Sequence, residues 1–142
     1  MIVLDTSVLA YAVGTDHPLR EPCRALLEAV RQGSLSASTT PEVIQEFVHI
    51  HSCRRARHLA VRLARRYAVG LAPLLLTEVS DLDRGLRLFE ENTELGAFDA
   101  VLAAVALRAG AEALVSADRA FASVRGLRFI EPLSAEFERL LA

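Results

Sequence analysis

The sequence predicts an α/β protein: a single three-layer α/β/α domain with a mostly parallel sheet of about five strands. Short apolar runs alternate with longer stretches of helical periodicity, and this alternation is typical of βαβ units. A length of 142 residues is that of one domain, so residues 1–142 are expected to form one. A hydrophobic content of 52% with 24% charged residues indicates a globular chain rather than a disordered one.

Five short runs are the expected strands. They are Ile2–Leu4, Leu35–Ala37, Leu74–Leu76, Ala113–Val115 and Leu127–Ile130. The first run is apolar throughout, as in strands that helices cover on both faces, and it ends directly at Asp5.

Seven segments between and after these runs have helical patterns. They are Ser7–Val13, Pro18–Gln32, Pro41–His51, Arg54–Tyr67, Asp81–Asn92, Ala97–Ala109 and Ala135–Leu141. Gly33 and Gly110 follow two of them and are typical helix stops. The segment Ala97–Ala109 is apolar almost all round, which predicts a helix in the centre of the domain, yet it carries Asp99 in its first turn.

Composition excludes several functions. The chain has no lysine, since all sixteen basic residues are arginine. P-loop nucleotide binding, Schiff-base chemistry and receiver domains each need a lysine and are therefore excluded. Cys23 and Cys53 fit neither a disulfide framework nor a metal knuckle and are expected to be reduced and partly buried. No run approaches the roughly 20 apolar residues that span a bilayer, and Asp5 argues against a signal peptide, so a cytoplasmic protein without membrane contact is expected.

Positive charge is concentrated in one segment. No Asp or Glu occurs between Phe47 and Thr77, and the six arginines there leave ten arginines against eighteen acids elsewhere, a balance of −8. Helical spacing from Arg54 to Tyr67 puts apolar residues on one face and basic residues on the other. We call Arg55, Arg62, Arg65 and Arg66 the Arg strip. The strip is a candidate RNA-binding surface, and an ordinary solvated helix face is the alternative.

Four carboxylates occur where a parallel α/β sheet places its ligand site. Asp5 directly follows the first expected strand, and Asp118 lies three residues after Ala113–Val115. Asp99 begins the central helix, and Glu46 lies on a polar stripe of Pro41–His51. Ligands of such sheets bind outside the carboxyl ends of the strands, so these side chains are expected to meet there.

Clustered carboxylates repel one another unless a cation lies among them. An all-oxygen donor set suits Mg²⁺ or Mn²⁺, and such a centre is typical of phosphodiester hydrolysis. Taken singly, each acid has an ordinary explanation: Asp5 and Asp118 as helix caps, Asp99 as a partner of the helix dipole, and Glu46 as a solvated side chain. Their joint placement favours a shared site, with Thr6, Ser7 and Ser116 as hydrogen-bonding supports.

The set of motifs resembles the PIN domain, and in particular the small VapC-type toxin ribonucleases of toxin–antitoxin pairs. The resemblance is carried by MIVLDTSVLAYA, TTPEVIQEFVHI, AFDAVLAAVAL and ALVSADRAF, in that order and spacing over nearly the whole chain. It implies a catalytic quartet of Asp5, Glu46, Asp99 and Asp118, with the metal held by the three aspartates. It also implies Ser116 at the family's Thr/Ser position, a homodimer, and inhibition by a small antitoxin.

The sequence therefore predicts a metal-dependent endoribonuclease, with Mg²⁺ or Mn²⁺ as cofactor and RNA as substrate. Two alternatives stay open at this point. One is a catalytically silent PIN-like module that holds RNA on the Arg strip, and the other is a small metal-dependent phosphatase that acts on monoesters.

Overall fold

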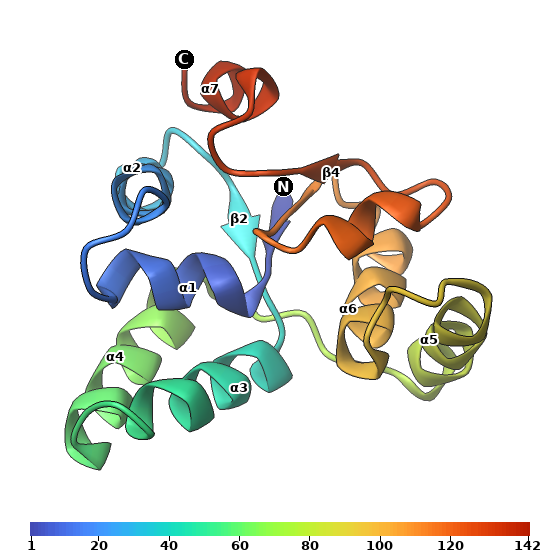
Figure 1. The fold of residues 1–142 in the computed structure, drawn as a ribbon, viewed down its shortest axis with the longest axis horizontal. Coiled ribbons are helices and arrows are strands. Elements are labelled where there is room, and N and C mark those ends of the chain that lie inside the picture. The colour runs from blue at the N-terminus through green and yellow to red at the C-terminus, as the bar shows by residue number, and fades with distance from the viewer.

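The computed structural model describes all residues from 1 to 142 and has a four-stranded parallel sheet (Figure 1). The strands are β1 (Ile2–Leu4), β2 (Ala37–Ser38), β3 (Leu114–Val115) and β4 (Phe129–Ile130), in the order β2-β1-β3-β4. In the register, Val3 pairs with Ser38 on one side and with Leu114 on the other. The predicted α/β class and parallel sheet are confirmed.

Seven α-helices and one short 3₁₀ helix surround the sheet. They are α1 (Thr6–Val13), α2 (Arg20–Arg31), α3 (Pro41–Ser52), α4 (Arg57–Gly70), α5 (Val79–Glu91), α6 (Ala97–Arg108), the 3₁₀ helix η1 (Arg119–Ser123) and α7 (Ala135–Leu141). Figure 1 shows α1 and α2 on one side of the sheet and α6, with α5 outside it, on the other. The chain has one hydrophobic core cluster of 24 buried residues. None of the helices combines the length and the apolar composition that crossing a membrane requires.

The prediction of a fifth strand at Leu74–Leu76 is wrong. This segment is extended but forms only one bond toward the sheet, from the Leu75 N–H to the Thr39 carbonyl at 2.9 Å. It follows Pro73, which has no N–H to donate to a ladder. Leu74 and Leu75 pack against the core, whereas Leu76 is 69% exposed, so the segment lies over the end of β2 without extending the sheet.

The central position of α6 is confirmed, since six of its residues are buried. Its packing against α5 depends on Gly85, where a Cβ atom would lie 2.8 Å from the Cα of Val101. Farther along the same pair of helices, Arg108 of α6 donates to the buried carboxylate of Asp81 at 2.9 Å. Close backbone approach and this ion pair hold α6, and with it Asp99, in a fixed position.

The helix α4 begins at Arg57, three residues later than predicted, so Arg55 lies in the turn between α3 and α4. Ala60 and Ala64 are the buried residues of this helix, whereas the apolar residue Leu59 is 38% exposed. Tyr67 anchors the helix by donating its hydroxyl to the Leu9 carbonyl at 2.9 Å. The turn also exposes Cys53, whereas Cys23 is buried, and both thiols are free.

Candidate active site

Asp5 is a buried carboxylate at the carboxyl end of β1, with 5% of its surface exposed. Its Oδ2 accepts hydrogen bonds from the hydroxyl of Ser7 at 2.8 Å and from that of Ser116 at 2.6 Å. Asp5 is also the N-cap of α1, which was the alternative role considered for this residue. Capping and a site role are compatible here, because the cap bond is long at 3.4 Å and the hydroxyl bonds orient the group.

Ser116 connects the ends of β1 and β3. It is fully buried after β3, donates to Asp5, and accepts the backbone N–H of Asp118 at 3.0 Å. Ser7 accepts the N–H of Ala117 at 3.0 Å. The two serine hydroxyls therefore tie the Asp5 carboxylate to the loop that carries Asp118. Ser7 joins Ser116 in this network, and its signal in the sequence was its place two residues after Asp5.

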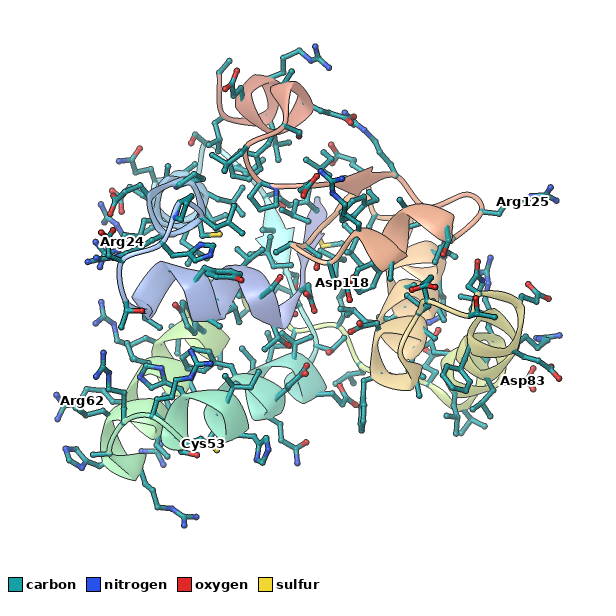
Figure 2. All side chains as sticks on the ribbon, viewed as in Figure 1. Arg24, Cys53, Arg62, Asp83, Asp118 and Arg125 are labelled. Carbon is teal, nitrogen blue, oxygen red and sulfur yellow. The ribbon has the colours of Figure 1, made fainter.

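Glu46 reaches the same region from α3. Its Oε2 accepts the hydroxyl hydrogen bond of the buried Thr6 at 2.6 Å, although the glutamate itself is on the exposed side of the helix. Asp118 is exposed as well and caps η1 by accepting from the N–H of Ala120 at 2.9 Å. Figure 2 shows Asp118 between the start of α1 and α6.

Asp99, in the first turn of α6, is half-buried, and the charges of the other three acids affect its ionisation. Burial, as the largest cause, and the negative charges of Asp5, Asp118 and Glu46 together raise its pKa to about 7. None of the four carboxylates forms an ion pair with a basic side chain. The structure thus brings the four predicted acids into one negatively charged region that lacks a protein counter-charge.

The donor set fits a divalent cation, but the side chains are not arranged around one. No group of three or more His, Cys, Asp or Glu side chains is placed to hold a metal ion. Glu46 and Asp118 are the exposed members of the four acids, and oxygen donors alone suit Mg²⁺ or Mn²⁺ rather than zinc.

The Arg strip lies away from this region. Figure 2 shows Arg62 at the outer edge of α4 and Asp118 near the middle of the molecule. Arg62, Arg65 and Arg66 line a shallow hollow on the outer face of α4, whereas Arg55 precedes the helix and does not line it. All four arginines are exposed. The structure therefore keeps three members of the strip together and separates them from the carboxylates.

Comparison with known proteins identifies the fold and the family. The family model described as "PIN domain" matches residues 2–127. The chain belongs to the PIN-domain family. It is 48% identical to Ribonuclease VapC7 of Mycobacterium tuberculosis over 99% of this chain and 98% of that protein. It is 31% identical to Ribonuclease VapC23 of the same organism over 87% and 97% of the two chains.

The PIN fold is also seen in a solved structure of low sequence similarity. That structure, VapBC2 from Rickettsia felis bound to a DNA fragment from their promoter, matches with a TM-score of 0.72 at 17% identity. The match covers 92% of this chain and 98% of that one. The predicted family, drawn from short motifs and their spacing, is confirmed, and this chain is a homologue of VapC ribonucleases.

Proposed function

We propose that this protein is a metal-dependent endoribonuclease that cuts RNA in the cytoplasm as the toxin of a toxin–antitoxin pair. The observation that carries the proposal is the convergence of Asp5, Glu46, Asp99 and Asp118 from separate elements into one region without a basic partner. Such an arrangement costs stability unless it binds a cation, so its chemistry supports a metal site. The ribonuclease names of the similar proteins support RNA as the substrate.

In this proposal Asp5, Asp99 and Asp118 hold the metal. Mg²⁺ or Mn²⁺, when bound, supplies positive charge for the phosphate and lowers the pKa of a water molecule. Ser7 and Ser116 keep the Asp5 carboxylate in one orientation through its Oδ2, which leaves Oδ1 for the ion.

Glu46 has a separate role as the proton acceptor. The Thr6 hydroxyl occupies its Oε2 at 2.6 Å, so the carboxylate is oriented and Oε1 is available to take a proton from the attacking water. A neutral glutamate then releases this proton to solvent, which its exposed position permits. Glu46 and Thr6 thus act on the nucleophile, while the three aspartates act on the metal.

One comparison tests the function against its alternatives. Purified protein is incubated with total RNA, with and without Mn²⁺, beside Asp99→Asn, and the new RNA ends are mapped by sequencing. We expect discrete ends only for the wild type with metal. RNA binding without cleavage would instead identify a silent RNA-binding module, and hydrolysis of nitrophenyl phosphate without RNA cleavage would identify a phosphatase.

The proposed partners are a small antitoxin and a second copy of this chain. The name VapBC2 of the similar Rickettsia felis structure supports the antitoxin. For the homodimer, support comes from an exposed apolar stripe on α5. The stripe consists of Val79, Leu82, Leu86 and Phe89. Asp83 and Arg87 lie beside it one turn apart, so two antiparallel copies of α5 would set opposite charges against each other.

The dimer is tested by sedimentation of Leu86→Asp, which places a charge in the middle of the stripe. We expect the mass of a monomer for this variant and of a dimer for the wild type. Val69→Asp, at an exposed apolar position on α4, is the matched control and should leave the dimer intact. A monomeric wild type, or a dimer that survives Leu86→Asp, would contradict this interface.

A further inference from the structure

Phe98 is the most exposed aromatic side chain of the protein. It is 84% exposed, compared with 47% for Phe89, and the remaining phenylalanines and tyrosines are buried or half-buried. It belongs neither to the core cluster nor to any of the aromatic pairs in the structure. A phenyl ring in water makes no large apolar contact within the protein, so both of its faces are available to a ligand.

The position of the ring is defined by Asp99. Phe98 directly precedes Asp99 in the first turn of α6, so their Cα atoms are about 3.8 Å apart and their side chains diverge by about 100° around the helix. The Asp99 carboxylate faces the other three acids. The backbone of Phe98 is thus next to a residue of the carboxylate site, and the exposed ring has the small, exposed residues Gly96 and Ala97 as its neighbours in the chain, which leaves it open to a ligand.

The negative charge of the four carboxylates favours an RNA contact that does not depend on charge. The four carboxylates repel a phosphate backbone, and no arginine is paired with any of them. The Arg strip is distant from them (Figure 2). Apart from the proposed metal ion, a nucleotide whose phosphate is at the site therefore needs a source of binding energy nearby that does not depend on positive side chains. Stacking of a base on an aromatic ring has this property and is the usual way in which proteins hold single-stranded RNA.

We propose that Phe98 is a substrate-binding residue that stacks on a base of single-stranded RNA beside the phosphate to be cut. This inference rests on the proposed ribonuclease function and adds a base-contacting residue to it. Because every base has a π-face, the contact positions the strand without selecting a sequence, and it excludes base-paired RNA, in which both faces of a base are occupied.

The first test measures RNA affinity in a Glu46→Gln background, where cleavage is removed and Phe98 is untouched. Phe98→Ala and Phe98→Leu should weaken binding about 5- to 150-fold, the range for loss of one stacked base. Phe98→Trp should bind as well as the parent or more tightly. Leu is the matched control, because it keeps an apolar side chain but no aromatic face. Equal affinity for the Leu variant and the parent would overturn stacking, as would a monomer produced by Phe98→Ala from a dimeric parent.

The second test changes the RNA instead of the protein. A series of oligoadenylates, each with one abasic position, is measured against the same Glu46→Gln protein with and without Phe98→Ala. One abasic position should reduce affinity by the same factor as Phe98→Ala, and combining the two should cause no further loss. Losses that multiply would overturn the pairing of ring and base.

The outcomes also separate this inference from the proposed function. Metal-dependent cleavage by the wild type with no effect of Phe98→Ala on affinity overturns the stacking role alone. Stacking behaviour in a wild type that cuts no RNA overturns the nuclease and retains the binding role. A protein that neither binds nor cuts RNA overturns both.

Discussion

The four carboxylates and the Arg strip are both charged regions, but the structure supports them in different ways. The carboxylates come from separate elements of the chain, and hydroxyls of Thr6, Ser7 and Ser116 orient two of them. The Arg strip comes from one helix and the turn before it, and its side chains extend freely into solvent. Convergence from distant elements indicates a preorganised site, whereas a strip on one helix indicates only a surface that attracts the opposite charge.

The two regions share a lack of counter-charges. Seven of the ten arginines outside the basic segment form ion pairs with acids, and none of the six within it does. The pKa of His51 is lowered by burial and by the charges of Arg55 and Arg54, which reflects the positive potential there. A metal ion at the carboxylates and an RNA chain on the strip would supply the two missing charges. The predictions below test each region in turn, from the largest expected effect to the smallest.

The largest effect is expected for the metal and its ligands. Chelation by EDTA, Asp5→Ala and Asp99→Ala should each lower RNA cleavage by at least about 100-fold, because each removes the cation or one of its main ligands. Asp16→Ala, an exposed aspartate outside the site, is the control and should cleave normally. The measurement is the initial rate on a labelled RNA, and full activity in EDTA would end the metal mechanism.

A smaller loss is expected when the support of a carboxylate is removed. Ser116→Ala deletes the 2.6 Å hydrogen bond to Asp5 and the acceptor of the Asp118 N–H. Loss of such an orienting group typically lowers metal affinity or activity about 10- to 100-fold, so we expect half-maximal activity at a higher Mn²⁺ concentration. Ser123→Ala removes an exposed hydroxyl bonded only to the Ala120 carbonyl and serves as the control. Equal metal affinity in the two variants would show that Asp5 needs no such support.

Stability should respond to Asp99 in the opposite direction from activity. The pKa of Asp99 is about 7 in the folded protein, well above the usual range of an aspartate in an unfolded chain. The folded state therefore holds a proton that the unfolded state loses, and stability declines as pH rises from about 4 to about 7. Asp99→Asn abolishes this decline and should stabilise the metal-free protein above pH 7 by on the order of 2–4 kcal/mol.

Thermal melts in EDTA and in Mn²⁺, from pH 4 to pH 8, measure this effect. Asp99→Asn should melt higher than the wild type in EDTA at pH 8, and the difference should vanish near pH 4. The variant should also lose the stabilisation that Mn²⁺ gives the wild type. A variant that melts lower and still gains from Mn²⁺ would show that the acids do not surround an ion.

Sequence reasoning recovered the parts of the structure that depend on burial. The central helix α6 was predicted from its apolar circumference, and Asp5 and Asp118 were predicted as site residues from the ends of strands, because both patterns follow from a covered parallel sheet. Sequence reasoning failed where tertiary contacts determine whether a segment joins the sheet, where a helix begins or which side chain is exposed. Leu74–Leu76 has the composition of a strand, but its pairing with the sheet stops after one bond. The start of α4 at Arg57 and the high exposure of the Phe98 ring carry no periodic signal at all.

The smallest effect is expected on the Arg strip, and salt is the variable that reveals it. If Arg62 contacts a backbone phosphate, binding releases condensed counterions, and log K falls against log[salt] with a slope of about −0.7 per contact on a single strand. Arg62→Gln keeps helix propensity and the aliphatic stem but deletes the charge, so the slope should become shallower by about 0.7. The affinity of catalytically inactive Asp99→Asn for RNA, with and without Arg62→Gln, is measured across a salt series.

The matched control for this measurement is Arg125→Gln. Arg125 also lacks an ion pair, and Figure 2 shows it on the opposite side of the molecule from Arg62. Both substitutions change the net charge equally, so a larger change of slope on the loss of Arg62 reports a local contact and not the overall charge. Equal changes of slope for Arg62→Gln and Arg125→Gln would mean that the Arg strip is an ordinary solvated helix face. Because phosphates carry no sequence information, the position of cleavage by active Arg62→Gln should stay unchanged, and a displaced position would mean that Arg62 contacts bases.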